Sequence, residues 1–224
     1  MVELACLLGT LAAYGVGLRL QGRTSSPLAN PTLIAILVIG AVLELSGLDY
    51  GRYEDATDPI AFLLGPAVVA LAVPLYVERA TLLDHTRHLL LGVLAGASVA
   101  MALGALVAWL ARFSDPFTLA VTTRTATSPV SIAIAEQLDG GAPALSAVLS
   151  ISSGLFAATF GPSLLDRLGV RLPVARGLAM GVTGHGIGTA RMLQESRLAG
   201  ATSSVGMGLG GLTVALVVPG LWGL

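Results

Sequence analysis

Six long apolar runs dominate the pattern of hydrophobic and polar positions, and short polar stretches separate them. The runs cover residues 2–18, 28–48, 60–77, 89–111, 142–165 and 201–221. Each run is close to the ~20 residues with which a helix crosses the hydrocarbon core of a bilayer. The apolar residues are continuous and do not alternate with polar ones, which excludes a transmembrane β-barrel. The pattern therefore predicts an all-α polytopic membrane protein, with residues 1–224 forming a single integral membrane domain.

Two further apolar segments, residues 117–138 and 174–193, are interrupted by polar residues and helix breakers. The first contains Arg124 and, at its centre, Pro129, and the second contains the stretch Thr-Gly-His-Gly-Ile-Gly-Thr. Several glycines weaken a plain spanning helix. A His or Arg at membrane depth needs a polar partner and marks a candidate functional site. We therefore expect two Gly/Pro-broken segments, either re-entrant or discontinuous.

The arginines test how these two segments sit in the membrane. If all eight segments cross and the N-terminus lies outside, six arginines are cytoplasmic and five lie outside. If the broken segments enter and return, nine are cytoplasmic, and only Arg52 and Arg112 lie outside. The second arrangement fits the positive-inside rule. It predicts about six full transmembrane helices, with the first broken segment entering from outside and the second from the cytoplasm. Eight crossings are the alternative.

Short matches between the two halves suggest a different symmetry. Residues 30–36 resemble residues 128–134, and residues 64–67 resemble residues 160–163. If every segment crossed, such repeats would be related by inversion, as they are in many transporters. Apolar residues also match by chance, so the inverted repeat stays a hypothesis beside the re-entrant arrangement.

Composition narrows the classes of function. Of the 224 residues, 54% are hydrophobic and 11% charged, and the mean hydropathy is +0.84. Soluble domains carry about 25% charged residues. Cys6 is the only cysteine, which rules out a disulfide within the chain. We interpret the first run as a retained span, because Glu3 and the lack of basic residues do not fit a signal peptide. No catalytic set, phosphate loop, metal-ligand spacing or nucleic-acid patch is present, so the sequence predicts no enzyme, metal or cofactor.

The broken segments carry the residues of a candidate anion site. Pro129 suits the opening turn of a half-helix that Thr127 or Ser128 can cap. A second half-helix is expected to begin near Gly188. Both N-termini would point into the protein and attract an anion through their N–H groups and dipoles. At Gly186 we expect a side chain to fill the cavity or to block a positive φ.

The same site suggests the chemistry of its substrate. Arginine and backbone N–H groups bind a carboxylate, and hydroxyl groups contact an adjacent hydroxyl or keto oxygen. This fits glycolate, glycerate, lactate or pyruvate. The candidate substrate-binding residues are Arg124, Thr123, Thr125, Thr127, Ser128, Pro129, Gly184, His185, Gly186, Gly188, Thr189 and Arg191. Coupling could use H⁺ through His185 or Na⁺ through exposed carbonyls.

Simpler interpretations exist for the three basic residues. Arg124 could reach the membrane interface with its long side chain. Arg191 could be an ordinary cytoplasmic charge at the end of a helix. His185 could be a structural histidine whose ring is satisfied by its neighbours.

Three stretches of the chain resemble the LrgB/CidB family of holin-like and antiholin-like bacterial membrane proteins. They are FLLGPAVVALAVPLY at 62–76, TRTATSPVSIAIAE at 123–136 and ARGLAMGVTGHGIGTARMLQE at 175–195. The middle stretch departs from the family, which typically has Pro-Lys-Ser-Val-Thr-Thr-Pro where this chain has residues 123–129. Arginine thus replaces lysine, and its forked geometry puts the ligand preference in doubt.

The resemblance implies a multi-pass protein of the bacterial inner membrane, embedded in the lipid bilayer, and two functions. One is a regulator of murein hydrolase export and autolysis. The other is transport, because a plastid relative fused to an LrgA-like half looks like a glycolate/glycerate transporter, and bacterial relatives are linked to pyruvate uptake. An LrgA/CidA-like membrane partner is also implied, and we expect a homo-oligomer in the form of a dimer. The polar residues of the broken segments favour a secondary transporter of small monocarboxylates, and the holin-like or antiholin-like regulator is the alternative.

Overall fold

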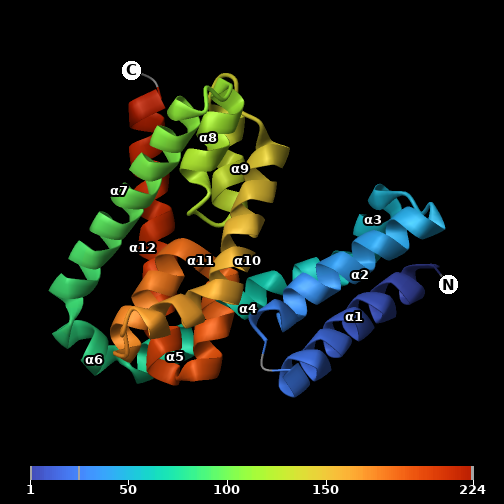
Figure 1. Cartoon of the computed structure of the whole chain (residues 1–224), viewed down its shortest axis with the longest axis horizontal. Helices are drawn as coiled ribbons and strands as arrows, with labels where there is room; N and C mark the ends of the chain where they lie inside the picture. The colour runs from blue at the N-terminus through green and yellow to red at the C-terminus, as the bar shows by residue number, and fades with distance from the viewer. Residues whose placement is uncertain (1, 25, 223–224) are drawn as a thin grey trace. The chain divides into compact units, whose positions relative to one another are not determined.

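The computed structural model describes residues 2–24 and 26–222, which contain helices and no strand (Figure 1). The helices are α1 (Val2–Thr24), η1 (Pro27–Ala29), α2 (Pro31–Ser46), α3 (Tyr50–Phe62), α4 (Leu64–Ala70), α5 (Ala72–Val77), α6 (Arg79–Asp84), α7 (Thr86–Leu110), α8 (Asp115–Thr123), α9 (Ser128–Gln137), α10 (Pro143–Arg167), α11 (Pro173–Glu195) and α12 (Arg197–Trp222). This confirms the all-α class.

Five helical stretches among the described residues are long and apolar enough to cross a bilayer. They are Val2–Thr24, Tyr50–Val77, Thr86–Leu110, Pro143–Arg167 and Arg197–Trp222, and the shorter apolar helix α2 makes a sixth candidate. The six correspond to the six runs seen in the sequence. The two broken segments correspond to α8 with α9 and to α11.

The chain divides into two compact units, Met1–Ala72 and Val73–Leu224. A single integral membrane domain therefore stays a prediction. In the first unit α1 packs closely on the start of α2, because a Cβ at Gly17 would lie 2.6 Å from the Cα of Pro31. Asn30 begins α2 by accepting the N–H of Thr32 at 2.9 Å and that of Leu33 at 3.2 Å, as an N-cap side chain does.

In the second unit, α11 is a hairpin and not a straight helix. Arg176 near its start and Glu195 at its end form a two-pronged ion pair with N–O distances of 2.9 and 3.0 Å. A straight helix would separate these residues by ~28 Å, at 1.5 Å per residue. The backbone of His185 is non-helical, with φ 36° and ψ −123°, and it divides the segment into two arms. We call Pro173–Glu195 hairpin 2.

The other broken segment, residues 115–137, also returns to the end at which it starts, and we call it hairpin 1. On α7, Gly92 contacts Leu178 of hairpin 2, and Gly104, nearer the C-terminus, contacts Arg124 at the tip of hairpin 1. On α10 the two hairpins are contacted in the opposite order along the chain. Ser150, nearer the N-terminus, forms a hydrogen bond with hairpin 1, and Asp166, nearer the C-terminus, accepts one from Arg176 of hairpin 2. Helices α7 and α10 are therefore antiparallel, and hairpin 1 joins two ends on the same side (Figure 1). Both broken segments therefore fold back, as the re-entrant arrangement predicts, and the side of the membrane from which each one enters stays a prediction.

The two hairpins pack against α7, α10 and α12 through small residues and a shared apolar core. The core cluster consists of Val93, Ala97, Met101, Leu119, Ala126, Ile134, Ala135, Val182, Val214 and Val218. Glycines let the backbones approach, as is usual where membrane helices pack. A Cβ at Gly177 or Gly181 would collide with backbone carbonyls of α12 at Ala199 and Ser203. Hairpin 2 therefore lies directly on α12.

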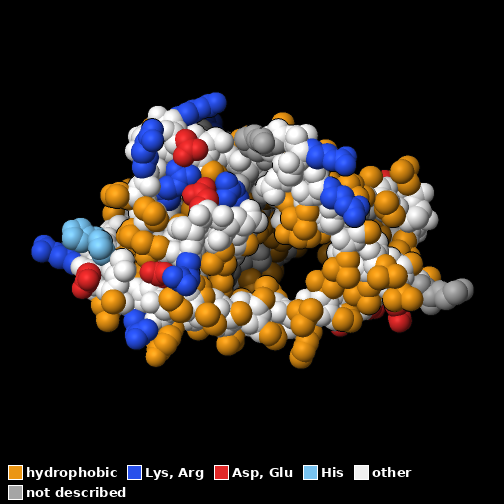
Figure 2. All heavy atoms as spheres, turned by 90° about the horizontal axis from the view of Figure 1, so that it is seen from below, with side chains coloured by type: hydrophobic (Ala, Val, Ile, Leu, Met, Phe, Trp, Pro, Cys, Tyr) orange, Lys and Arg blue, Asp and Glu red, His pale blue; other side chains and the backbone are white. Residues whose placement is uncertain are grey.

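Charged side chains gather at the end of this unit that holds both ends of hairpin 2. Arg176 bonds Asp166 at 2.6 Å as well as Glu195, and Arg197 at the start of α12 pairs with Glu78 at 2.7 Å. Hydrogen bonding to Glu195 raises the pKa of Arg176 further above its ordinary value. Figure 2 looks onto a face where arginine and acidic side chains lie together among hydrophobic ones. The cytoplasmic position of this end stays a prediction from the arginine count.

Candidate substrate site where the two hairpins meet

Hairpin 1 turns inside the second unit and begins α9 as the sequence predicts. Thr127 holds the N-cap position with extended backbone (φ −63°, ψ 152°), and Pro129 follows in the first turn. The predicted side-chain cap is wrong, because neither Thr127 nor Ser128 caps the helix with its hydroxyl. The first N–H groups of α9 therefore keep no side-chain acceptor. In addition, the Thr125 hydroxyl is buried without a hydrogen-bond partner.

The Arg124 side chain at this tip points toward α7. Its Nη1 donates to the carbonyl of Val121 at 2.7 Å, and the guanidinium fills the space beside Gly104. Within the part of the chain that the structure describes, no carboxylate lies within 4 Å of this guanidinium. A half-buried arginine thus carries its charge at the tip of a re-entrant segment with no acidic partner there.

His185 at the tip of hairpin 2 contacts hairpin 1 directly. Its Nε2 lies 3.3 Å from the carbonyl oxygen of Arg124, and its side chain is buried. The ring fits there because α10 has Gly154 at the contact, where a Cβ would lie 2.8 Å from the His185 Cε1. The two broken segments therefore meet at His185 and Arg124.

The backbone at this tip differs from the expectation in one respect. The positive φ belongs to His185 and not to Gly186, and a Cβ at Gly186 would meet nothing within 4 Å. The expectation that Gly186 needs a positive φ is therefore wrong. Gly188 is the tightly packed glycine, because its Cβ would lie 2.5 Å from the carbonyl oxygen of Met180 on the opposite arm. The second arm resumes helix directly after His185, slightly before the predicted start.

Two of the predicted residues, Thr189 and Arg191, lie away from the meeting point. The Thr189 hydroxyl is buried and shares a 2.9 Å hydrogen bond with Ser203 of α12. Arg191 pairs with Glu195 at 3.4 Å in the charged cluster. Thr123 is buried, and its hydroxyl bonds the Leu119 carbonyl of its own helix. Substrate binding by all of these residues stays a prediction, but the structure groups only part of the set around His185.

Sequence reasoning missed the polar residues of α10 that support hairpin 1. The Ser131 hydroxyl of α9 donates to the Thr123 carbonyl at 2.8 Å and lies 2.8 Å from the Ser150 hydroxyl. Ser146, Ser150 and Gly154 recur every four residues and so share one helix face. That spacing was the available signal for a polar and small face of α10 against the broken segments.

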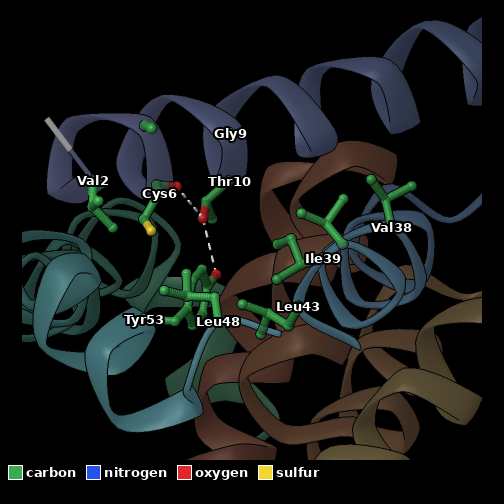
Figure 3. Close-up of a pocket in the computed structure, with 11 residues that line it drawn as sticks. Val2, Cys6, Gly9, Thr10, Val38, Ile39, Leu43, Leu48 and Tyr53 are labelled. Atoms are coloured by element: carbon green, nitrogen blue, oxygen red, sulfur yellow. Dashed lines mark hydrogen bonds between the residues drawn. The ribbon is translucent and has the colours of Figure 1, made fainter. Parts of the chain in front are cut away.

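Two cavities among the described residues lie away from the His185–Arg124 contact. In the first unit, a cavity of about 260 Å³ is lined by α1, α2 and α3 side chains, among them Cys6, Ile39 and Leu43. Its polar feature is the 2.9 Å hydrogen bond between Thr10 and Tyr53 (Figure 3). In the second unit, a mostly apolar cavity of about 350 Å³ lies between α7, α8 and the end of α12. It includes Thr122, two residues before Arg124.

These features define the class: a polytopic α-helical membrane protein in which two re-entrant hairpins meet inside one helical unit. The chain matches the LrgB-like family over residues 10–224, and it belongs to that family. It is accordingly a multi-pass protein of the bacterial inner membrane.

Several relatives match over nearly their whole length. The chain is 34% identical to the uncharacterized protein YxaC of Bacillus subtilis, over 93% of this chain and 90% of that protein. It is 30% identical to an uncharacterized protein of Haemophilus influenzae, over 94% and 90%. It is also 30% identical to the holin-like protein CidB of Staphylococcus epidermidis, over 95% and 93%. No solved structure matches the chain.

Proposed function

We propose that this protein is a secondary transporter that moves small monocarboxylates of the glycolate, glycerate, lactate and pyruvate type across the inner membrane. One observation carries the proposal. Arg124 presents a guanidinium at the tip of a re-entrant segment, and no acidic partner lies beside it among the described residues. A charge at membrane depth is costly unless paired, and such residues mark substrate paths.

The surroundings of Arg124 suit an anion with a second oxygen. The first turn of α9 supplies N–H groups and the positive end of a helix dipole. Its Thr127 N-cap leaves those donors uncapped, and the buried Thr125 hydroxyl needs a partner. A carboxylate would accept from the guanidinium and the N–H groups, and a hydroxyl or keto oxygen would contact Thr125.

The two facing hairpins supply a way to move. Irregular backbone at membrane depth is tolerated where it is buried in protein or lines a wet cavity, and broken helices of this kind form transporter sites. In the proposed cycle, hairpin 1 and hairpin 2 close the path from opposite sides and separate alternately at the His185–Arg124 contact. Coupling to H⁺ through His185 or to Na⁺ through tip carbonyls belongs to the same proposal.

The test is uptake of labelled pyruvate, lactate and glycolate into proteoliposomes, with and without H⁺ or Na⁺ gradients. Arg124→Ala should abolish uptake with expression intact, and Arg124→Lys should keep part of it because the charge remains. Arg79→Ala is the matched control, since Arg79 is exposed on α6, outside the hairpins. Normal uptake by Arg124→Ala would remove the main support for an anion site.

A second candidate is a holin-like or antiholin-like regulator of murein hydrolase export and autolysis. The name of the Staphylococcus epidermidis relative, holin-like protein CidB, supports it more directly than it supports transport. Holin activity needs oligomers that open large lesions. Proteoliposomes loaded with both a small dye and a protein-sized dextran separate the two functions. Release of dextran by the wild-type protein favours the holin-like function, and gradient-dependent pyruvate uptake without dye release favours transport.

A further inference from the structure

Helix α7 has a notch where the Arg124 side chain lies against it. A Cβ at Gly104 would collide with Nη1 of Arg124, and it would lie 3.0 Å from the carbonyl oxygen of Val121. That same carbonyl accepts the single hydrogen bond of the guanidinium, at 2.7 Å. Gly104 is buried within α7. The absent side chain therefore provides the space in which the guanidinium meets its acceptor.

Another glycine of α7 provides a comparison. A Cβ at Gly96 would lie 3.5 Å from the Val182 Cγ1, which is an ordinary van der Waals contact. Both glycines sit on the same helix and both face a hairpin. Alanine therefore fits at Gly96 with little change, and at Gly104 it cannot fit unless the Arg124 guanidinium moves.

We propose that Gly104 is the positioning residue for Arg124, so that α7 belongs to the substrate site although no side chain of α7 contributes to binding there. With Nη1 held by Val121, the Nε and Nη2 donors have no acceptor among the described residues and keep a fixed direction. A free arginine side chain loses considerable rotamer entropy when it binds a ligand, and a pre-organised fork loses less. The notch therefore favours binding of a planar carboxylate. This inference rests on the proposed transport function.

The test compares Gly104→Ala with Gly96→Ala in the uptake assay, alongside thermal stability in detergent. Gly104→Ala should raise the KM for its best substrate about tenfold or more, which is the size expected for losing one charge-assisted hydrogen bond. The maximal rate should change less, and Gly96→Ala should behave like the wild type. A purely structural clash would instead lower stability and active protein without this separation of KM from rate.

A second background shows whether the effect acts through Arg124. Lysine has a single terminal nitrogen and no Nη1 at the notch. Adding Gly104→Ala to the Arg124→Lys variant should therefore raise the KM little further. An equal increase of KM in both backgrounds would overturn the inference, and so would equal behaviour of the two alanine variants. Those results leave transport itself intact if Arg124→Ala is inactive. If Arg124→Ala transports normally, the proposed function fails first.

Discussion

The ion pair that joins the two ends of hairpin 2 gives the most direct test of the fold. Arg176 and Glu195 have side chains 10% and 21% exposed and meet through two N–O contacts of 2.9 and 3.0 Å. Glu195→Gln removes the charge and keeps the shape. Arg176 then retains the Asp166 carboxylate and the Val170 carbonyl, at 2.6 and 3.0 Å.

The size of the effect follows from burial. Breaking a fully buried pair costs about 3–5 kcal/mol, and a hydrogen bond to a charged group contributes about 1.5–3 kcal/mol. This pair is partly exposed and Arg176 keeps a second partner, so about 2 kcal/mol is expected for Glu195→Gln. Asp166 is 68% exposed, so Asp166→Asn should cost within about 1 kcal/mol, as exposed pairs do.

Hydrogen exchange measured by mass spectrometry detects this loss of stability in individual segments of the chain. If hairpin 2 opens as a unit, 2 kcal/mol corresponds to roughly thirtyfold faster exchange of its amides. The amides of α7 should exchange at the wild-type rate. The reasoning fails if exchange in α11 is unchanged by Glu195→Gln, because in a straight helix these residues would be far apart. It also fails if Asp166→Asn loosens α11 as much.

Three other outcomes are expected. His185→Gly should be more stable than His185→Ala by about 1 kcal/mol or more, because both variants lose the ring but only glycine adopts a positive φ without strain. Equal melting temperatures of the two variants would contradict the backbone conformation at this tip. Gly188→Ala should destabilise by about 1–3 kcal/mol through overpacking, whereas Gly186→Ala should melt like the wild type because a Cβ there meets nothing within 4 Å; the reverse order would contradict the packing of hairpin 2. A cysteine at exposed Leu172, in a Cys6→Ser background, should resist impermeant thiol reagents added to intact cells, and ready labelling would place this loop outside.

The spanning helices and the broken segments could be predicted because both depend on local composition. An apolar run of about 20 residues has few alternatives to a membrane helix. A segment with Arg124 and Pro129, or with three glycines around a histidine, cannot behave as a plain span. The arginine count predicted that both segments fold back. It could do so because the distribution of arginines near the membrane depends on the side on which a loop lies and not on how the helices pack.

The arrangement of the site could not be predicted in the same way, because it depends on contacts between distant segments. The sequence placed Arg191 and Thr189 beside Arg124 because all three are polar and lie in broken segments. Packing instead gives Thr189 a partner on α12 and Arg191 one at Glu195. Gly104 carried no signal at all, because a glycine in a membrane helix is common and its notch is visible only beside Arg124.

The position of the positive φ is the least predictable feature and the most informative about function. Glycine accepts φ 36° without strain, and glycines stand on both sides of His185, yet the histidine adopts it. A residue other than glycine in such a conformation costs about 1–3 kcal/mol, and such strain clusters at functional sites. Here the ring fills the space beside Gly154 and forms, among the described residues, the only hydrogen bond between the two hairpins. The polar link between the tips is thus a single 3.3 Å contact from a strained residue, and the apolar core cluster supplies the rest of the packing around them. In the proposed transport cycle the two tips are gates that open alternately, and a weak polar link between them suits that role.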